Sequence, residues 1–332
     1  MKRVFGVLIL VVVLILAGCS GAGKGPQGED SKPEEPKRLN VATATTGGAY
    51  YPAGLAAAQL WTEKGGFQAS ASTSAGSVEN IDLLSKGEAN IVCVQADILH
   101  AAYSGEGKFE GQEHKELRIL APILSQHYNM VIRKGAGINS INDWKGQRVV
   151  VGRAGSGTVV THERVLETFG ISIDDINASY LGQSEAIEAI RNGLADATIA
   201  VGAAPLSAVS DAVATPGSNA LIYSLTEEEV KALGEHNWWM VPMPIPAGTY
   251  PNQDKEINAV GHNGFFVVRE DFPEDLAHKL VKLMYEEKDW LQDAYSGFKS
   301  PAFLEPGLAL EQISVPAHPG TIKYLKEANL MK

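Results

Sequence analysis

Short apolar runs alternate with longer amphipathic stretches along most of the chain, which is the pattern of strands that alternate with helices. Near the start of this region the order is strand, helix, strand, helix, strand. These runs occupy residues 38–44, 51–65, 67–77, 78–88 and 89–95. The order predicts a parallel sheet covered by helices, with binding loops at the carboxyl ends of the strands.

The same alternation returns further along the chain. Strand-like and helical runs follow one another again in residues 147–152, 158–170, 177–182, 184–193, 196–202 and 204–215. A second α/β lobe is therefore expected. Nearly three hundred residues follow Leu39, and a chain of this length is usually too long to pack around a single hydrophobic core.

Two long extended runs are placed to connect the lobes. Residues 117–135 could carry the chain out of the first lobe, and residues 256–270 could carry it back. Residues 272–291 would then form a helix on the first lobe. We predict lobe I from residues 39–125 and 259–332 and lobe II from residues 126–258, joined by two crossings that make a hinge.

The amino terminus is typical of a secreted lipoprotein. Lys2 and Arg3 precede an apolar run that is shorter than the ~20 residues a membrane helix needs, which indicates a signal peptide over residues 1–18. Leu16-Ala17-Gly18-Cys19 resembles a bacterial lipobox, so Cys19 is the expected lipidation site, although a cysteine could end an ordinary signal by chance. Residues 19–38 are rich in Gly, Pro and charge and are expected to form a flexible tether. This predicts an extracytoplasmic protein with a lipid anchor in the membrane.

Charge and cysteine content narrow the class of partner. Without Lys2 and Arg3 the chain has 26 basic and 39 acidic residues, a net charge of −13, which makes nucleic acid an improbable partner. Cys93 is the one cysteine after Cys19, so no disulfide is expected in the folded part. The apolar run around Cys93 indicates a buried, inert thiol.

The glycine-rich stretch 151–170 is the first candidate site. A strand ends in a glycine turn that opens a helix, and the amide groups at such a junction attract anions. The stretch lacks the lysine of a phosphate-binding loop and the G-x-G-x-x-G spacing, which argues against a nucleotide. Either the glycines serve only a tight turn, or the amides of Gly157 and Thr158 and the hydroxyls of Ser156 and Thr158 hold a small carboxylate.

Three loops of the first lobe are further candidates for recognition. Each follows a strand and offers small or hydroxylated residues, amides or tyrosines. The candidates are Thr45, Thr46, Gly47, Gly48, Tyr50, Tyr51, Ser74, Gly76, Ser77, Asn80, Gln95 and Asp97. One of the two tyrosines is expected to pack on the core instead.

Catalysis has weaker support in the sequence. The chain has no nucleophile elbow, no H-E-x-x-H motif and no cysteine cluster, and residues 250–258 lack the ligand spacing of a calcium loop, so no catalytic residue, metal or cofactor is predicted. A lone histidine on a helix, His162, is expected at the surface. An enzyme would need a base near the cleft, for which Asp97, His162 and Glu185 are the candidates.

Several motifs together resemble one known family. They are "TGGAYYPAG", "SAGSVENIDLLSKGEANIVCVQADILHAAYSGEGKF", "INDWKGQRVVVGRAGSGT", "IRNGLADATIAVGAAP", "PAGTYPNQDKEI" and "VPAHPGTIKYLKEANL", in this order. From about Leu39 to Leu330 the chain resembles the TAXI family of solute-binding proteins, the substrate-capturing subunits of one class of TRAP transporters.

The resemblance implies a type II periplasmic-binding-protein fold and uptake of a carboxylate such as glutamate, glutamine or 2-oxoglutarate through a sodium-driven TRAP permease. It also implies a set of ligand contacts, which with Thr46 from the first loop gives the predicted site: Thr46, Tyr50, Tyr51, Ser77, Asn80, Gln95, Ser156, Gly157, Thr158, Gly202, Ala203 and Pro205. One departure matters, because the family's Gly-Thr-Gly-Gly start of the first loop is replaced by Ala42-Thr43-Ala44-Thr45.

The sequence thus predicts a lipid-anchored, monomeric binding protein that captures a small carboxylate and performs no chemistry on it. Two alternatives stay open at this stage. The same binding could serve a signalling partner, and the same scaffold could hold an enzyme. Whether Arg153 contacts the ligand or faces solvent also stays open.

Overall fold

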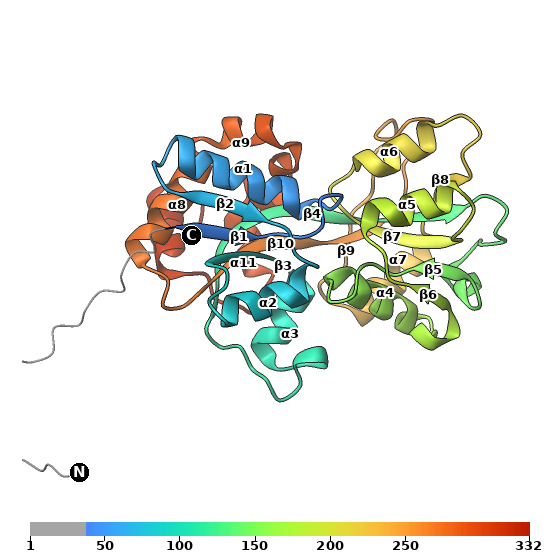
Figure 1. Cartoon of the computed structure of the whole chain (residues 1–332), viewed down its shortest axis with the longest axis horizontal. Coiled ribbons are helices and arrows are strands. Elements are labelled where there is room, and N and C mark those ends of the chain that lie inside the picture. Colours follow the sequence, from blue (N-terminus) through green and yellow to red (C-terminus); the bar gives the residue numbers. More distant parts are fainter. Residues whose placement is uncertain (1–37) are drawn as a thin grey trace, which may run out of the picture. The chain divides into compact units, whose positions relative to one another are not determined.

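A computed structural model describes residues 38–332, and the predicted signal peptide, the predicted lipidation site Cys19 and all of the predicted tether but Arg38 lie outside these residues. Figure 1 shows two lobes in which strands are flanked by helices: lobe I is the part with strands β1 to β3, and lobe II is the part with strands β5 to β7. The strands are β1 (Leu39–Ala42), β2 (Ala69–Ser72), β3 (Ile91–Gln95), β4 (Leu117–Arg133), β5 (Arg148–Val150), β6 (Asn177–Ser179), β7 (Ala197–Gly202), β8 (Ala220–Ile222), β9 (Val241–Pro242) and β10 (Val260–Arg269).

Helices cover both faces of the strands in each lobe. In Figure 1, α1 and α9 lie on one face in lobe I and α2 and α3 on the other, while α5 and α6 lie opposite α4 and α7 in lobe II. The α-helices are α1 (Tyr50–Glu63), α2 (Ser77–Ser85), α3 (Ala96–Ser104), α4 (Gly157–Thr168), α5 (Gln183–Arg191), α6 (Ser207–Ala214), α7 (Glu227–His236), α8 (Glu274–Glu286), α9 (Lys288–Ala294), α10 (Pro301–Leu304), α11 (Pro306–Glu311) and α12 (Pro319–Glu327). Short 3₁₀ turns are η1 (Gly107–Phe109), η2 (Ile141–Trp144), η3 (Ile173–Asp175) and η4 (Ser296–Lys299).

The strands of the described region form one continuous sheet in the order β2-β1-β3-β10-β4-β7-β5-β6, with β8 beside β4 and β9 beside β10. The pairs β1–β2, β1–β3, β5–β6 and β5–β7 are parallel, as the alternation of strands and helices predicts. The pairs that involve β4 or β10 are antiparallel. These two strands are the ones that run between the lobes.

Strand β4 is shared by the two lobes. Its first part pairs with β10 from Leu117 to His127, and its last part pairs with β7 from His127 to Ile132. The two crossings predicted from the extended runs are thus the neighbouring strands β4 and β10, visible in the middle of Figure 1. The boundaries 39–125 with 259–332 and 126–258 stay a prediction.

Each lobe has its own apolar core. The lobe I cluster includes Trp61 and Phe266, whose ring centroids are 5.8 Å apart, and it contains Cys93, which is completely buried as predicted. Lobe II has one cluster around Trp144 and a second around Ile187. Each lobe is therefore stabilised by apolar contacts of its own.

The predicted helix over residues 272–291 is wrong in one respect. It is divided at Glu287, whose φ of −105° and ψ of 29° leave the helical range, so that α8 ends and α9 begins there. The second piece contacts α1 and η4, which shows that packing on lobe I overrides a sequence pattern that reads as one helix.

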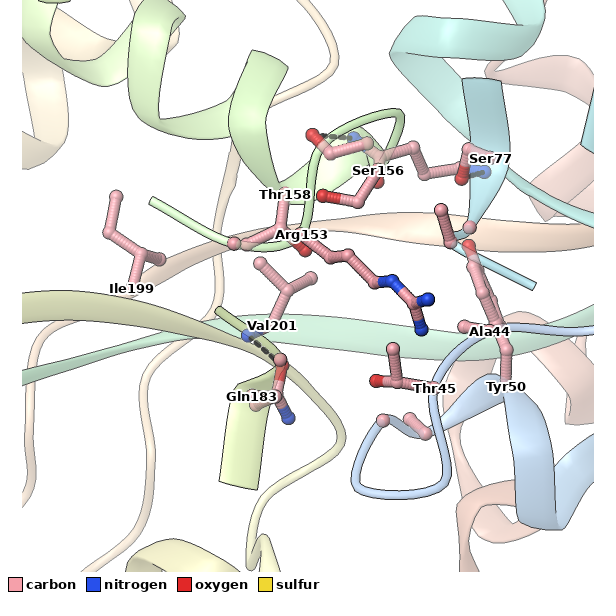
Figure 2. A pocket seen from close by; sticks show the side chains of 18 of the residues that line it. Ala44, Thr45, Tyr50, Ser77, Arg153, Ser156, Thr158, Gln183, Ile199 and Val201 are labelled. Carbon is pink, nitrogen blue, oxygen red and sulfur yellow. Dashed lines mark hydrogen bonds between the residues drawn. The ribbon is translucent and has the colours of Figure 1, made fainter. Parts of the chain in front are cut away.

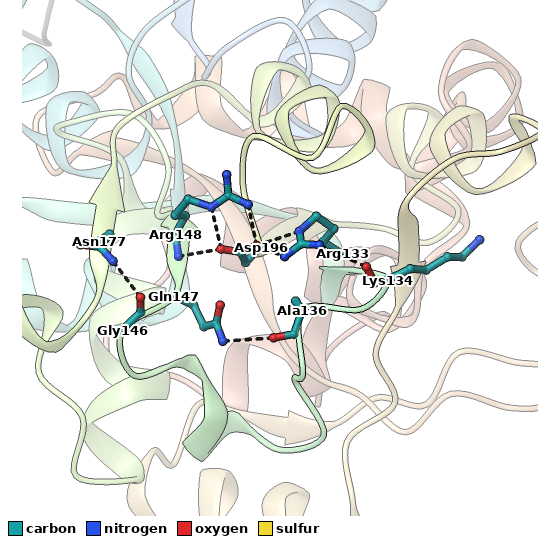
Figure 3. A network of polar contacts seen from close by, with 8 residues as sticks. All are labelled: Arg133, Lys134, Ala136, Gly146, Gln147, Arg148, Asn177 and Asp196. Atoms are coloured by element: carbon teal, nitrogen blue, oxygen red, sulfur yellow. Dashed lines mark hydrogen bonds and ion pairs between the residues drawn. The ribbon is translucent and has the colours of Figure 1, made fainter.

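A buried ion cluster fixes one end of the lobe II sheet (Figure 3). Asp196 lies just before β7, and its side chain is only 5% exposed. Its carboxylate accepts hydrogen bonds from Arg133 Nε and Arg148 Nε, both at 2.8 Å. These bonds tie the end of β4 and the start of β5 to the start of β7, and the Arg148 and Arg133 side chains hold the pKa of Asp196 well below its usual range.

Candidate functional site

A small cavity lies between the lobes where the strands of both lobes end (Figure 2). Its volume is about 50 Å³, and residues of both lobes line it. The loops after β1 and β2 and the last residue of β3 contribute one wall, and the loops after β5 and β6 face them together with residues of strand β7 itself. This is where ligands are expected in folds of parallel strands and helices.

In the described part of the chain, four helices begin at this cavity. The lining residues at the starts of these helices are Gly48, Ala49 and Tyr50 for α1, Gly76 and Ser77 for α2, Ser156, Gly157 and Thr158 for α4, and Gly182 and Gln183 for α5. The first amide groups of a helix have no partner within it and carry a partial positive charge. Their convergence makes the cavity attractive to an anion.

The α4 helix begins as the sequence predicts. Ser156 is the N-cap residue, and its Oγ accepts a hydrogen bond of 3.3 Å from the Val159 amide. Gly152 and Gly155 have φ of +101° and +81°, which is the reason that glycine is favoured in this turn. The hydroxyl hydrogen of Ser156 and the amides of Gly157 and Thr158 are therefore left to donate toward the cavity.

The side-chain chemistry of the lining also favours an anion. Arg153 is the only charged residue that lines the cavity within residues 38–332, and Figure 2 shows its guanidinium reaching across toward Ala44, Thr45 and Tyr50. The Tyr50 hydroxyl is buried in the cavity wall without a hydrogen-bond partner in the described region. Burial raises the pKa of Tyr50, so its hydroxyl stays protonated and can donate.

Direct contacts hold the lobes together beside the cavity. Gln95 Nε2 of lobe I donates to Gly157 O at 3.3 Å and to Thr161 Oγ1 at 3.2 Å in lobe II. Gln183 Nε2 of lobe II donates to Gly47 O at 3.3 Å. A Cβ atom at Gly157 would collide with Gln95 and one at Gly47 with the Ser184 side chain, so glycine permits this closed arrangement.

The structure places half of the predicted contacts at the cavity. The predicted residues that line it are Tyr50, Ser77, Gln95, Ser156, Gly157 and Thr158. Those that do not line it are Thr46, Tyr51, Asn80, Gly202, Ala203 and Pro205.

The residues outside the lining have other positions. Thr46 is exposed, and its neighbour Thr45 lines the cavity instead. Tyr51 is half-buried outside the cavity, which distinguishes it from Tyr50. Asn80 is completely buried, and its amide donates at 2.7 Å to the carbonyl groups of Thr43 and Cys93, so it holds the ends of β1 and β3 together.

Two glutamines in the lining were not predicted. Gln183 follows β6 as Gln95 ends β3, and its Oε1 accepts a hydrogen bond of 3.1 Å from the Val201 amide. Gln126 lies within the long apolar strand β4, where its Oε1 accepts from the imidazole of His262 at 3.1 Å. A polar residue inside an apolar run is the signal that could have pointed to Gln126.

The prediction that His162 lies at the surface is wrong. Its side chain is completely buried in lobe II, where Nδ1 donates to Thr158 O at 2.8 Å and Nε2 accepts from the Ile199 amide at 2.9 Å. Burial lowers the pKa of His162 to about 4, which keeps the ring neutral. The imidazole ring joins α4 to β7 because it accepts a hydrogen bond from a β7 amide. The spacing of residues along α4 gives no indication of this partner on a distant strand.

None of the three candidate bases lines the cavity. His162 is inside lobe II, Asp97 lies behind the wall formed by Gln95, and Glu185 is exposed on α5. Over residues 38–332, no cluster of His, Cys, Asp and Glu has a geometry that could hold a metal ion. The same region contains no helix with the length and apolar character needed to cross a bilayer.

Comparison with known proteins gives a family. A family model described as the NMT1-like family matches residues 41–328. The chain therefore belongs to the NMT1-like family.

Solved structures show the fold. MatC from Rhodopseudomonas palustris with bound malate is similar at a TM-score of 0.55 and 14% identity, over 84% of this chain and 97% of that chain. A protein from Bordetella bronchiseptica RB50 is similar at a TM-score of 0.51 and 17% identity, over 90% of each chain. The periplasmic aliphatic sulphonate binding protein SsuA from Escherichia coli is similar at 0.43 and 16% identity, over 88% of this chain and 84% of that chain. The predicted type II-like fold of periplasmic binding proteins, with two α/β lobes and two crossings, is confirmed.

Proposed function

We propose that this member of the NMT1-like family is an extracytoplasmic solute-binding protein that captures a small carboxylate and delivers it to a TRAP-type permease. The observation that carries the proposal is the interlobe cavity on which four helix starts and Arg153 converge, with no acidic residue among its lining in the described region. Such a site is built to hold a negative group without changing it.

The mechanism follows from the two lobes and the two shared strands. An open form exposes the cavity, and the ligand contacts the α1 and α2 starts in lobe I and the α4 and α5 starts in lobe II. A ligand favours closure only through contacts that require both lobes at once. The Gln95 bonds to Gly157 O and Thr161 Oγ1 then add contacts between the lobes in the closed form.

Three features support the more specific parts of the proposal. The fold is shared with MatC, whose structure contains malate, a carboxylate. The motifs that resemble the TAXI family support a TRAP permease as the partner. The lipobox-like sequence at Cys19 supports a lipid anchor and a monomer that acts next to the membrane.

The test is a binding screen by thermal shift followed by titration calorimetry on the mature protein. Carboxylates, amino acids, sulfonates, phosphonates and neutral sugars would be compared, because a ligand of the folded state raises the melting temperature. We expect binding among the carboxylates. Binding of neutral sugars alone would contradict the proposal.

The alternative of a sensing subunit predicts the same binding. Reconstitution of the mature protein with a TRAP permease in vesicles distinguishes the two, since a transport subunit drives uptake of the bound acid and a sensing subunit does not. An enzyme on this scaffold is less favoured because Asp97, His162 and Glu185 all lie outside the cavity lining. Chemical conversion of a bound carboxylate by the purified protein would favour an enzyme over a binding protein.

A further inference from the structure

We propose that the ligand is a small acid without an ammonium group, such as a 2-oxo or 2-hydroxy acid, and that the cavity discriminates against the matching amino acid. The proposal rests on the proposed function and makes its ligand class narrower. Its basis is the balance of hydrogen-bond donors and acceptors in the lining.

Among the described residues that line the cavity, the one charged side chain is cationic, and the acids Glu79 and Glu185 in the first turns of α2 and α5 lie outside the lining. Arg153 and the starts of α1, α2, α4 and α5 are positive, and within residues 38–332 no Asp or Glu lines the cavity. An ammonium group that leaves water needs an anionic partner or several good acceptors. Here it would meet a positive potential and no carboxylate.

Four of the polar side chains in the lining already accept a hydrogen bond. Ser77 Oγ accepts from the Gln95 amide at 3.2 Å, and Ser156 Oγ accepts from the Val159 amide at 3.3 Å. Gln183 Oε1 accepts from Val201 N, and Gln126 Oε1 accepts from His262. What each of the two serines has left to offer a ligand is chiefly an O–H donor.

The Tyr50 hydroxyl adds an independent sign of a ligand acceptor. Tyr50 lines the cavity and is 5% exposed, and its buried hydroxyl has no hydrogen-bond partner in the described chain. A buried hydroxyl without a partner is costly unless a ligand supplies one. A carboxylate or an oxo oxygen fits a donor of this kind, whereas an ammonium group fits poorly.

The experiment compares ligands that differ only at carbon 2. Titration calorimetry would use three series on the mature protein: pyruvate, lactate and alanine; 2-oxoglutarate, 2-hydroxyglutarate and glutamate; and 4-methyl-2-oxopentanoate, its 2-hydroxy acid and leucine. In the series that binds best, we expect the oxo or hydroxy acid to bind at least tenfold tighter than the amino acid.

The outcomes separate this proposal from the one it rests on. An amino acid that binds as tightly as its oxo partner overturns the ligand class and leaves the solute-binding function intact. If no acid of any series binds while a ligand without a carboxylate does, both proposals fail.

A different observation concerns Asp97, the second residue of α3. Its side chain is buried, and the Gln95 side chain and the Ile98 amide lie near its carboxyl group. It lies at a gap of about 180 Å³ between α3 of lobe I and α4 of lobe II, lined also by Val160 and Arg164.

Helix α4 of lobe II contributes to this burial. Val160 of α4 packs in the hydrophobic cluster of lobe I although the rest of that cluster comes from lobe I elements. Gln95, two residues before Asp97, bonds to Gly157 and Thr161 of α4. When the lobes separate, α4 leaves this surface and water reaches the carboxyl group.

We infer that closure of the lobes takes up a proton at Asp97. Burial raises the pKa of Asp97 to about 6 in the closed form, although the nearby Gln95 amide, the first amides of α3 and the Arg164 guanidinium each lower it in part. In an open, hydrated form the carboxyl group returns toward its ordinary pKa of about 4. The charged form is therefore penalised more in the closed state than in the open state.

The titratable and charged groups around Asp97 come from every element packed on it. They are His100 on α3, Glu106 and Lys108 before and in η1, Glu163, Arg164 and Glu167 on α4, Tyr50 on α1, Cys93 on β3 and Tyr128 on β4. Burial also lowers the pKa of His127 to about 4 and of His262 to about 3. Because of these lowered pKa values, both imidazole rings stay neutral above pH 5. His127 lies on β4 and His262 on β10, the two strands shared by the lobes.

The sign of the effect follows from the raised pKa. The contribution of Asp97 to closure is complete below about pH 4, decreases as the pH rises to about 6, and is constant above that. Ligand affinity of the wild type should therefore be several-fold, up to roughly tenfold, higher at pH 5 than at pH 7. Asp97→Asn should bind tighter than the wild type at pH 7 and lose this dependence.

Calorimetry between pH 5 and pH 8 checks this with the best-binding 2-oxo acid, whose carboxyl group stays ionised over the range. Titrations at pH 6 in two buffers of different ionisation enthalpy measure the proton uptake directly. An unchanged pH profile in Asp97→Asn, or a flat profile in the wild type, overturns the inference. The melting temperature of the free variant shows whether it is folded, and the buffer comparison on the wild type decides the case if it is not.

Discussion

Arginine has opposite surroundings at the two ends of the lobe II sheet. At the amino ends of β5 and β7, Arg148 and Arg133 bind the buried carboxylate of Asp196 (Figure 3). Just past the carboxyl end of β5, Arg153 lines the cavity and forms no ion pair with a carboxylate in the described region (Figure 2).

The difference shows how one residue type serves two purposes. A carboxylate that is already present neutralises the first pair and fixes three strands, so this charge contributes to stability. The positive potential of the Arg153 guanidinium remains available to a ligand, because no carboxylate of the described chain forms an ion pair with it. Three substitutions test this division, and their expected effects decrease in the order given.

Asp196→Asn should have the largest effect. It leaves two partly exposed guanidinium groups around an amide, and the loss of their charged hydrogen-bond acceptor costs on the order of 2 kcal/mol. Urea denaturation at pH 7 measures the loss, and Asp211→Asn on the exposed side of α6 is the matched control. Ligand affinity of the folded variant should stay within about twofold of the wild type.

The pH dependence of this effect has a defined sign. The pKa of Asp196 is held below its unfolded value, so its contribution is present above about pH 4 and is lost as the pH falls toward the folded value. The difference in unfolding free energy between wild type and Asp196→Asn should therefore decrease below about pH 4. A constant difference down to pH 2 would contradict the assignment.

Arg153→Gln should have the opposite signature. It removes the only charged side chain in the lining, so affinity for the bound acid should fall at least tenfold, about 1.4 kcal/mol, while the unfolding free energy changes little. Calorimetry and denaturation measure the two quantities. Arg191→Gln, an arginine paired with Glu188 on α5, is the control of equal charge change. If Arg153→Gln destabilises the fold and leaves affinity unchanged, the comparison of the two ends fails.

Arg148→Gln should have the smallest effect. The Arg148 side chain is 46% exposed, and Arg133 still neutralises Asp196 when it is gone. We expect a loss of about 1 kcal/mol in unfolding free energy, as for a partly exposed ion pair. A loss as large as that of Asp196→Asn would mean that Arg133 does not hold the carboxylate by itself.

The sequence by itself determined the elements of two stretches and the two shared strands, whereas α3, α7, β8, β9 and α10 to α12 were not predicted. Strand and helix periods in residues 38–95 and 147–215 predicted both sets of elements, and the two long extended runs predicted the shared strands β4 and β10. Apolar periodicity is a local property, and so it survives in the fold. The start of α4 was also predictable, because Ser156 and the glycines before it act on their immediate neighbours.

Only the tertiary structure decided which side chains face the cavity. Tyr50 and Tyr51 are adjacent in the sequence, yet only Tyr50 lines it, and Asn80 binds the ends of two strands instead. The buried positions of His162 and Asp97 likewise depend on β7 and on α4, which are distant in the chain. The direction of a side chain in a loop after a strand depends on contacts with other elements, and a local sequence pattern contains no information about those contacts.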